Sequence, residues 1–401
     1  MKHRLAEHTG PVVDATDVNH RRGRGDEMSD ACANRLCIID PLLTTYDRKV
    51  YVELATHFKI AVLYSPTAVT EGYGKQVVRD WPRSIDLIEV RTARPFGNRF
   101  GMFQRGVAAY LVLERPHIAI VCANLRYASF WVVLVLCRLL RIRVYARGHG
   151  LFKKRRASLW LRVAYRALLT LADGYICYTP SVKHSLEQAG CSRTKLRVAE
   201  NSLTNECFVT PQEKTGTERG ILFIGRLRKN SHVGSLLTAA AKLVVEGVPL
   251  QVHAVGDGEE RQTVEEFWGR QSWAHFYGEL YEAEAIRTIS RQCFVGCYPG
   301  NTGLSIVHMM SLSLPPILHD NLAAHQGPEP SYVIDQTNGL LFDYWNAEAS
   351  LYETIKHAMR SPAALKSLQS GAFATYVALT TPSQAERLAA IIWDDSKRAC
   401  A

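Results

Sequence analysis

The sequence predicts an α/β protein built from two Rossmann-like halves, each with a mostly parallel sheet covered by helices. Short apolar runs alternate with helical segments in the first half, a polar stretch at 211–219 interrupts this pattern, and the alternation restarts at Gly220. Such alternation is typical of parallel sheets. Because 401 residues exceed one ordinary core, two domains are expected. Two such halves predict a cleft at the carboxyl ends of their strands.

Each element is expected from its apolar pattern and from the residues that bound it. In the first half the expected strands are 35–39, 60–64, 85–90, 117–121, 143–146, 174–178 and 195–199, and the expected helices are 51–58, 103–114, 130–140, 157–172 and 181–189. In the second half the strands are 220–224, 250–255, 275–277 and 293–298, and the helices are 233–246, 259–268 and 282–292.

The domain organisation follows from these elements. Residues 1–33 are expected to be a disordered N-terminal extension, in which Met28 is an alternative start. The N-terminal domain is predicted at 34–210, the linker at 211–219 and the C-terminal domain at 220–380. A last helix within 381–401 follows Pro382, and we expect it to pack back on the N-terminal domain.

Composition excludes several classes of protein. An apolar share of 47% and a charged share of 21% describe a soluble globular chain. The apolar run 130–137 stops at Arg138 and is far shorter than the roughly 20 residues that a spanning helix needs. No secretory signal is apparent, and the scattered cysteines indicate buried thiols in a reducing, cytoplasmic setting. Cys293 and Cys297 lack a matching second pair, so zinc is not expected.

The charge is unevenly placed along the chain. The net charge is +10, and residues 101–200 hold 17 Lys and Arg against 4 Asp and Glu. In segment 152–166 and the turn of helix that follows, cations alternate with Trp160, Val163 and Leu168, which favours contact with the anionic inner face of a membrane. Alternatively, the apolar stripe faces the domain's own core. Nucleic acid would suit the same charge, but no reader motif accompanies it, so nucleic-acid binding is not expected.

One turn has the composition of a phosphate site. The apolar run that ends at Tyr298 leads into Gly300 and Gly303, followed by an apolar helix of about three turns and then by Pro315-Pro316. Amides and the positive end of a helix dipole would converge on one point there. His308 lies just over one turn into that helix. The alternative is a βαβ corner that binds no ligand.

Five motifs together resemble the retaining glycosyltransferases of family 4, over roughly residues 35–395. They are Val144-Tyr-Ala-Arg-Gly-His-Gly150, Ala172-Asp-Gly-Tyr-Ile-Cys-Tyr-Thr-Pro-Ser181 with Val198-Ala-Glu-Asn-Ser202, Ile221-Leu-Phe-Ile-Gly-Arg-Leu227, Val255-Gly-Asp-Gly-Glu259, and the segment from Pro299 to Ile317. The resemblance implies the GT-B fold, with two Rossmann-like domains facing each other across a cleft. It also implies a nucleotide-sugar donor and a departing diphosphate stabilised without metal or other cofactor.

The resemblance also implies roles for particular residues. His149 would bind the donor sugar, and Arg226 would contact the diphosphate; the alternatives are a capping or core histidine and a solvated arginine. The remaining expected donor-binding residues are Lys229, Gly300, Asn301, Thr302, Gly303 and His308. On the acceptor side we expect Asn124 at a strand end and Thr44 and Thr45 after the first strand, although the threonines alternatively shape a loop.

Two departures from the family concern charged side chains. Ser231 stands where the family usually has a lysine, so Lys229 is the candidate for that charge. Gly300 and His308 stand where the family usually has two glutamates. The backbone amides of Asn301, Thr302 and Gly303 would then make more of the contacts with the donor. His308 would hydrogen-bond to the ribose hydroxyls. This version of the motif resembles bacterial surface-polysaccharide transferases.

The leading hypothesis is a peripheral membrane glycosyltransferase of the cytoplasm that extends a lipid-linked saccharide during polysaccharide biosynthesis. A nucleotide-sugar epimerase or hydrolase of the same fold is one alternative. A non-catalytic subunit that binds glycan or nucleotide sugar is another, because the usual lysine and glutamate are missing.

Overall fold

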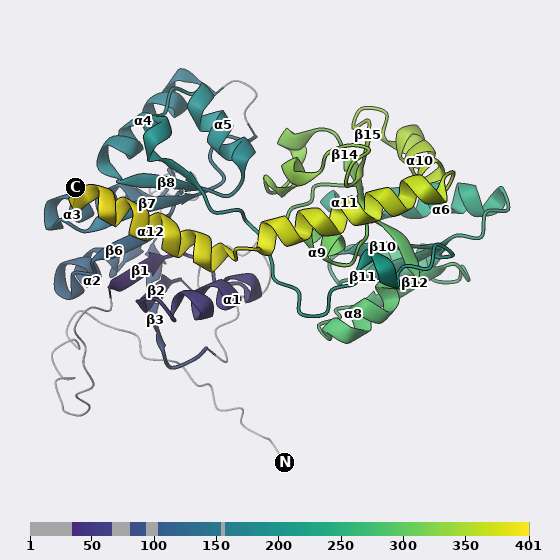
Figure 1. The fold of residues 1–401 in the computed structure, drawn as a ribbon, viewed down its shortest axis with the longest axis horizontal. Coiled ribbons are helices and arrows are strands. Elements are labelled where there is room, and N and C mark those ends of the chain that lie inside the picture. Colours follow the sequence, from purple (N-terminus) through teal and green to yellow (C-terminus); the bar gives the residue numbers. More distant parts are fainter. Residues whose placement is uncertain (1–33, 66–80, 94–102, 154–156, 401) are drawn as a thin grey trace, which may run out of the picture.

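The computed structural model describes residues 34–65, 81–93, 103–153 and 157–400. The expected N-terminal extension 1–33 and residues 154–156 of the basic segment lie outside these ranges. Two α/β domains stand side by side, and a pair of C-terminal helices connects them (Figure 1). This arrangement confirms the predicted α/β class with two mostly parallel sheets.

The N-terminal sheet has seven parallel strands in the order β3-β2-β1-β6-β7-β8-β9. Its strands are β1 (Arg35–Ile39), β2 (Lys59–Tyr64), β3 (Ile85–Glu89), β6 (Ile118–Cys122), β7 (Arg143–Gly148), β8 (Gly174–Cys177) and β9 (Leu196–Val198). Its helices are α1 (Thr45–Leu54), α2 (Val107–Glu114), α3 (Ala128–Leu140), α4 (Leu159–Leu171) and α5 (Pro180–Gln188). The strand order reverses between β1 and β6, where a crevice opens at the carboxyl edge of such sheets.

The C-terminal sheet has six parallel strands in the order β12-β11-β10-β13-β14-β15. Its strands are β10 (Gly220–Ile224), β11 (Gln251–Val255), β12 (Ala274–Gly278), β13 (Cys293–Cys297), β14 (Pro316–His319) and β15 (Leu340–Phe342). The helices are α6 (Val233–Val245), α7 (Arg261–Trp268), α8 (Ala283–Ser290), α9 (Ser305–Ser311), α10 (Ala347–Ala358) and α11 (Pro362–Thr380). Here the order reverses between β10 and β13.

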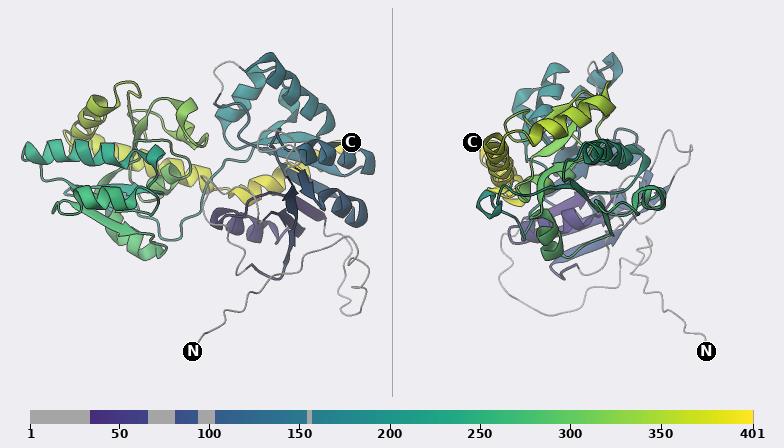
Figure 2. Two further views of the ribbon diagram at one scale, coloured as in Figure 1. Left: turned by 180° about the vertical axis from the view of Figure 1, so that it is seen from behind. Right: turned by 90° about the vertical axis from the view of Figure 1, so that its right-hand side faces the viewer.

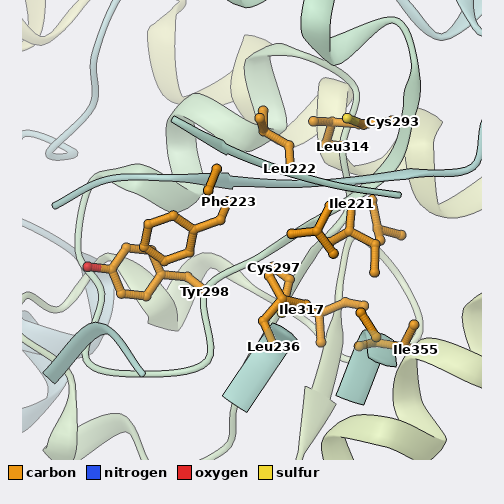
Figure 3. Close-up of a cluster of buried hydrophobic side chains, with 14 of the residues drawn as sticks. Ile221, Leu222, Phe223, Leu236, Cys293, Cys297, Tyr298, Leu314, Ile317 and Ile355 are labelled. Carbon is orange, nitrogen blue, oxygen red and sulfur yellow. The ribbon is translucent and has the colours of Figure 1, made fainter. Parts of the chain in front are cut away.

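The C-terminal core forms around the central strands β10 and β13 (Figure 3). Ile221, Leu222 and Phe223 of β10 are fully buried, and helices α6 and α10 contribute Leu236 and Ile355. Apolar residues in consecutive positions suit strands that helices cover on both faces. Because the central strands are this well buried, the loops at their carboxyl ends start from rigid positions.

The last helix, α12 (Gln384–Cys400), returns to the N-terminal domain. Figure 1 shows α11 and α12 in yellow along the molecule, and the left view of Figure 2 shows the same crossing from behind. Leu388 and Ile392 are buried in one apolar cluster with residues of β1, β2 and α1. At the end of this contact, Arg197 forms an ion pair with Asp395 at 2.6 Å. The helix therefore ties the two domains together.

Several expected elements differ from those observed. The predicted helix 103–114 is a short strand, β5 (Phe103–Arg105), paired with β4 (Arg91–Ala93), and the helix begins only after Gly106. The apolar helix after Gly303 is α9, which has 7 residues instead of about three turns. Helices α10 and α11 were not expected at all.

The polar segment 211–219 packs against the C-terminal domain. Lys214 is buried, and its ammonium donates to the carbonyl oxygens of Ser290 (2.7 Å) and Cys293 (3.1 Å). Glu213 forms ion pairs with Arg287 and Arg291 of helix α8 and the residue after it. The polar composition of this segment therefore reflects specific contacts on the C-terminal domain.

The packing of α12 gives a testable prediction. Replacing Leu388 with Ala removes a fully buried side chain, so the free energy of unfolding should fall by about 2–5 kcal/mol. Leu139→Ala is the matched control: Leu139 is 73% exposed, and its change should stay within roughly 0.5 kcal/mol. Guanidinium denaturation followed by circular dichroism measures both. Equal unfolding midpoints for the two variants would contradict the docking of α12.

Candidate active site

His149 follows strand β7, and the backbone of the next residue, Gly150, is held by two tyrosines. The N–H of Gly150 donates to the hydroxyl of Tyr175 (3.1 Å), and the hydroxyl of Tyr165 donates to the carbonyl of Gly150 (3.1 Å). Gly150 has a φ of +53°, and a Cβ there would lie 2.7 Å from Val182 Cγ1. Glycine is thus needed directly after His149, because the chain turns sharply against helix α5.

The imidazole of His149 sits among aromatic rings. Its centre lies 4.9 Å from that of Tyr178 and 5.9 Å from that of Phe152, both in edge-to-face geometry. Burial lowers the pKa of His149 to about 4, and the positive charges of Lys153 and Arg147 act in the same direction. The ring is therefore neutral near pH 7, with one nitrogen donating and the other accepting.

Three cationic residues follow strand β10, and they occupy different positions. Arg228 lines a cavity between the domains, where its guanidinium donates to the side-chain oxygen of Gln326 (2.8 Å). Arg226 is half-buried beside Tyr281 and does not line this cavity. Lys229 is exposed, and its backbone N–H donates to Glu259. The two expected residues, Arg226 and Lys229, thus lie at the carboxyl edge of the sheet but do not line the cavity. Of the three cationic residues, Arg228 lines it, and Arg228 was not among the expected residues.

The glycine-rich turn after β13 already has hydrogen-bond acceptors for its amides. Gly300 donates to the carbonyl of Ser231 (3.0 Å), Asn301 to that of Asn230 (2.8 Å), and Thr302 to Nδ1 of His325 (3.3 Å). For Asn301 and Thr302, the expectation that their amides face a phosphate therefore does not describe this conformation. Asn301 still lines the cavity, whereas Thr302 is buried.

Gly300 makes a close approach that explains its identity. A Cβ at this position would lie 2.1 Å from the carbonyl oxygen of Asn230 and 2.7 Å from the carbonyl carbon of Ser231. Both are backbone atoms, so any larger residue would push the turn Lys229–Ser231 away. The departure from the family's glutamate is therefore a packing requirement of this chain.

His308 and Gly303 flank the same turn. His308 is the fourth residue of α9 and half-buried; burial lowers its pKa to about 4. It does not line the cavity. Gly303 lies near the buried carboxylate of Glu329, which accepts a hydrogen bond from Asn201 of the N-terminal domain (2.5 Å). The turn is thus joined to the interdomain contact.

Side chains from both domains line a single cavity of about 500 Å³. The N-terminal domain contributes His149, Gly150, Leu151, Phe152, Lys153, Leu161 and Tyr165, and the C-terminal domain contributes Arg228, Asn230, Tyr298, Asn301, Ala324 and Gln326. The wall from the N-terminal domain is largely apolar, and the opposite wall is polar. Lys153 and Arg228 bring positive charge from opposite sides, which suits an anionic group held between the domains.

The expected acceptor-side residues are not among those that line this cavity. Thr44 caps helix α1: its side-chain oxygen accepts from the N–H of Asp47, and its hydroxyl donates to the carboxylate of Asp47 (2.6 Å). Thr45 is the first residue of α1. Asn124 follows β6, and its side-chain oxygen accepts from the N–H of Arg126 (3.2 Å). Local hydrogen bonding accounts for Thr44 and Asn124, in line with the loop-shaping alternative for Thr44.

Sequence reasoning missed several residues of the cavity. Arg228 lies two residues after Arg226, and this spacing along an extended segment was the available signal. Lys153 had been assigned to a membrane surface. The contributions of Tyr298 and Gln326 depend on how distant segments meet, for which the local pattern holds no signal.

Among the residues that the structure describes, no group of three or more His, Cys, Asp and Glu side chains is arranged to hold a metal ion. None of the helices described is long and apolar enough to cross a membrane.

Comparisons with known proteins agree with this geometry. Residues 53–203 match the family model described as Glycosyltransferase Family 4, and residues 218–361 match the model described as Glycosyl transferases group 1. The two matches cover most of the chain and fall on one domain each. No curated protein matches the sequence.

Three solved structures illustrate the similar fold. HepE (Alr3699) of Anabaena, with UDP and glucose bound, has a TM-score of 0.62 at 14% identity over 89% of this chain and 98% of its own. Sucrose-phosphate synthase of Thermosynechococcus elongatus gives 0.65 at 16% over 92% and 100%. The lipopolysaccharide outer core galactosyltransferase WaaB, in its apo form, gives 0.57 at 13% over 86% and 99%.

At these identities the structural likeness establishes the fold, and the predicted GT-B architecture is confirmed. Together with the two domain matches, it identifies the chain as a glycosyltransferase of the GT-B fold.

The close approach at Gly300 gives a second prediction. Gly300→Ala should destabilise the protein by about 1–3 kcal/mol, because backbone atoms must move to admit the methyl group. Gly303→Ala is the matched control, since its nearest neighbour is a carboxylate oxygen of Glu329 at 3.4 Å. Thermal unfolding of both variants checks this. If Gly300→Ala unfolds at the wild-type temperature, the turn is looser than the structure shows.

Proposed function

We propose that this protein is a retaining glycosyltransferase that transfers a sugar from a nucleotide-sugar donor to a lipid-linked saccharide in polysaccharide biosynthesis. The observation that carries the proposal is the cavity in which His149 of one domain faces Arg228 of the other. Resemblance to retaining enzymes supports the stereochemical outcome, with the leaving phosphate accepting the acceptor's proton on the same face of the sugar.

Positive charge in the cavity supports loss of a nucleoside diphosphate. The leaving group gains negative charge as the glycosidic bond breaks, and preorganised cations stabilise that charge. Arg228 is held by Gln326, and Lys153 approaches from the opposite wall. In this proposal these side chains, with Arg226 close by, supply the charge without a metal ion.

The neutral imidazole of His149 fits a sugar ligand. A neutral ring donates one hydrogen bond and accepts another, as a sugar hydroxyl requires. The lowered pKa keeps this state throughout the physiological range. In the proposed complex, His149 therefore orients the donor sugar while Arg228 faces its diphosphate.

The apolar wall supports an amphiphilic acceptor. Leu151, Phe152, Leu161 and Tyr165 form this side of the cavity, and Leu161 lies in the first turn of α4. The same turn exposes Leu159 and Trp160 to solvent, by 75% and 68%. An acceptor with an apolar tail would bury otherwise exposed surface there, because apolar contact is favourable in water.

The donor is the first testable point of this proposal. UDP-sugars should be tried first, since HepE was solved with UDP-glucose, followed by GDP-, dTDP- and CDP-sugars. A true donor at 100 times its dissociation constant should raise the free energy of unfolding by about 2.7 kcal/mol in a thermal-shift assay. Arg228→Met should then lower kcat/KM by roughly 100- to 1000-fold with that donor.

The controls separate a transferase from its alternatives. Arg270→Met changes an exposed arginine ahead of β12, at the opposite edge of the sheet, and should leave kcat/KM unchanged. Release of free sugar without an acceptor would favour a hydrolase. Binding of a donor without turnover of any acceptor would favour a non-catalytic subunit. Full activity in both His149→Ala and Arg228→Met would show that the cavity has no role in the reaction.

We further propose that the exposed face of helix α4 rests on the inner, anionic face of a membrane. Trp160 and Val163 are exposed, and Arg162 and Arg166 are exposed on the same helix. Leu168 is buried with Ala164 and Tyr165, so one face of α4 packs on the domain's own core along most of its length, while Trp160 and Val163 lie on the exposed face. Each cation near an anionic leaflet contributes about 1 kcal/mol.

Vesicle binding tests this surface. Trp160→Ser should weaken binding to vesicles of phosphatidylcholine and phosphatidylglycerol by roughly tenfold, because a large apolar side chain no longer enters the interface. Trp345→Ser is the matched control, since Trp345 is 86% exposed but lies in the C-terminal domain. Cosedimentation at low and high salt measures both. Equal loss for the two variants would contradict the proposed orientation.

A further inference from the structure

A buried cation lies directly behind His149. Arg147 is the fifth residue of β7, is 6% exposed, and places its guanidinium carbon 5.1 Å from the ring centre of Tyr178. Its Nε has no hydrogen-bond partner among the residues that the structure describes. Burying a guanidinium costs free energy unless its charge is used or compensated. Its contact with an aromatic face therefore requires an explanation.

Tyr178 connects this cation to His149. It is the first residue after β8, and its ring contacts both the guanidinium of Arg147 and the imidazole of His149, whose centre lies 4.9 Å away. Its backbone carbonyl accepts hydrogen bonds from the N–H of Asn201 (2.6 Å) and from the hydroxyl of Tyr332 (2.9 Å). Because Tyr332 belongs to the C-terminal domain, both domains fix the backbone of Tyr178.

We propose that Arg147 is a positioning residue for His149: its guanidinium fixes the ring of Tyr178, and this ring holds the imidazole toward the cavity. A cation over a tyrosine face is attracted by the ring's quadrupole, and the attraction grows when water is excluded. The positioning itself follows from the contacts; only the sugar-binding role of His149 rests on the proposed function.

The positive charges around His149 lower its pKa, as burial does. Its neighbours from the N-terminal domain are Arg147 and Lys153, with the rings of Phe152 and Tyr178. From the C-terminal domain, Arg228 and Tyr298 line the same cavity. The nearby positive charges disfavour an imidazolium.

Arg147 itself remains charged because of its other neighbours. Burial disfavours the charged form of Arg147, but the carboxylates of Asp47 and Asp40 hold its pKa above the usual value. In return, burial and the charge of Asp47 raise the pKa of Asp40 to about 7, against the opposing effect of Arg147. A charged guanidinium thus has both a carboxyl group and a neutral histidine among its electrostatic neighbours.

Proton titration of His149 tests the proposal without relying on activity. In full-length protein, imidazole resonances assigned by comparison with His149→Ala report its pKa. Arg147→Met should raise that pKa by about one unit, a tenfold change in the protonation equilibrium. Arg138→Met, which removes an exposed arginine of α3, should leave it unchanged. An unchanged His149 titration in folded Arg147→Met would overturn the proposal.

Two further variants make the test decisive. Tyr178→Leu keeps the backbone carbonyl but removes the ring, so the pKa of His149 should again move toward 6.5 even if Arg147→Met does not fold; no movement would overturn the proposal.

With an active donor, Arg147→Met should lower kcat/KM about tenfold in the wild-type background, and should have no further effect in His149→Ala. Additive losses would show that Arg147 acts independently of His149. A shifted titration in a protein that binds no nucleotide sugar would support the positioning and refute the proposed function.

Discussion

The position of the site depends on one hydrogen-bonded junction centred on Asn201, where the chain leaves the N-terminal domain. Its side-chain N–H donates to the buried carboxylate of Glu329, and its side-chain oxygen accepts from Gln384 at the start of α12. Its backbone N–H donates to the carbonyl of Tyr178, which also accepts from Tyr332. One asparagine therefore joins the carboxyl edges of both sheets to the crossing helix.

This junction explains why residues far apart in sequence share one cavity. Parallel strands place all their following loops at one edge of a sheet, so each domain presents its polar residues together. Glu329 lies close to Gly303 in the turn after β13, and Tyr178 touches His149 after β7. A change in domain orientation at Asn201 would thus act directly on the residues on both sides of the cavity.

Much of the fold was predictable from the sequence, because buried parallel strands give continuous apolar runs between turn residues. The strand ahead of His149 and the strand ahead of Arg226 were placed correctly for this reason. Helix α11 was missed: its apolar positions face a second buried cluster, with Ala372 and Tyr376, and its composition varies little around the helix. The reach of Arg228 into the cavity was also missed, because it depends on Gln326, nearly a hundred residues later.

The two positions that depart from the family's usual residues lie in contact with each other. Positions 231 and 300, where the resemblance places a lysine and a glutamate, are in direct contact here, since the N–H of Gly300 donates to the carbonyl of Ser231. Removing only one of two opposite charges from such a contact would leave the other without compensation, at a cost of several kcal/mol when buried. Removing both avoids that cost and lets the backbones approach. The buried hydroxyl of Ser231 accepts from the N–H of Arg228 and donates to its carbonyl, so the turn that lost the lysine now holds the backbone of the arginine that lines the cavity. Positive charge is therefore retained at this edge of the sheet, three residues before its usual place.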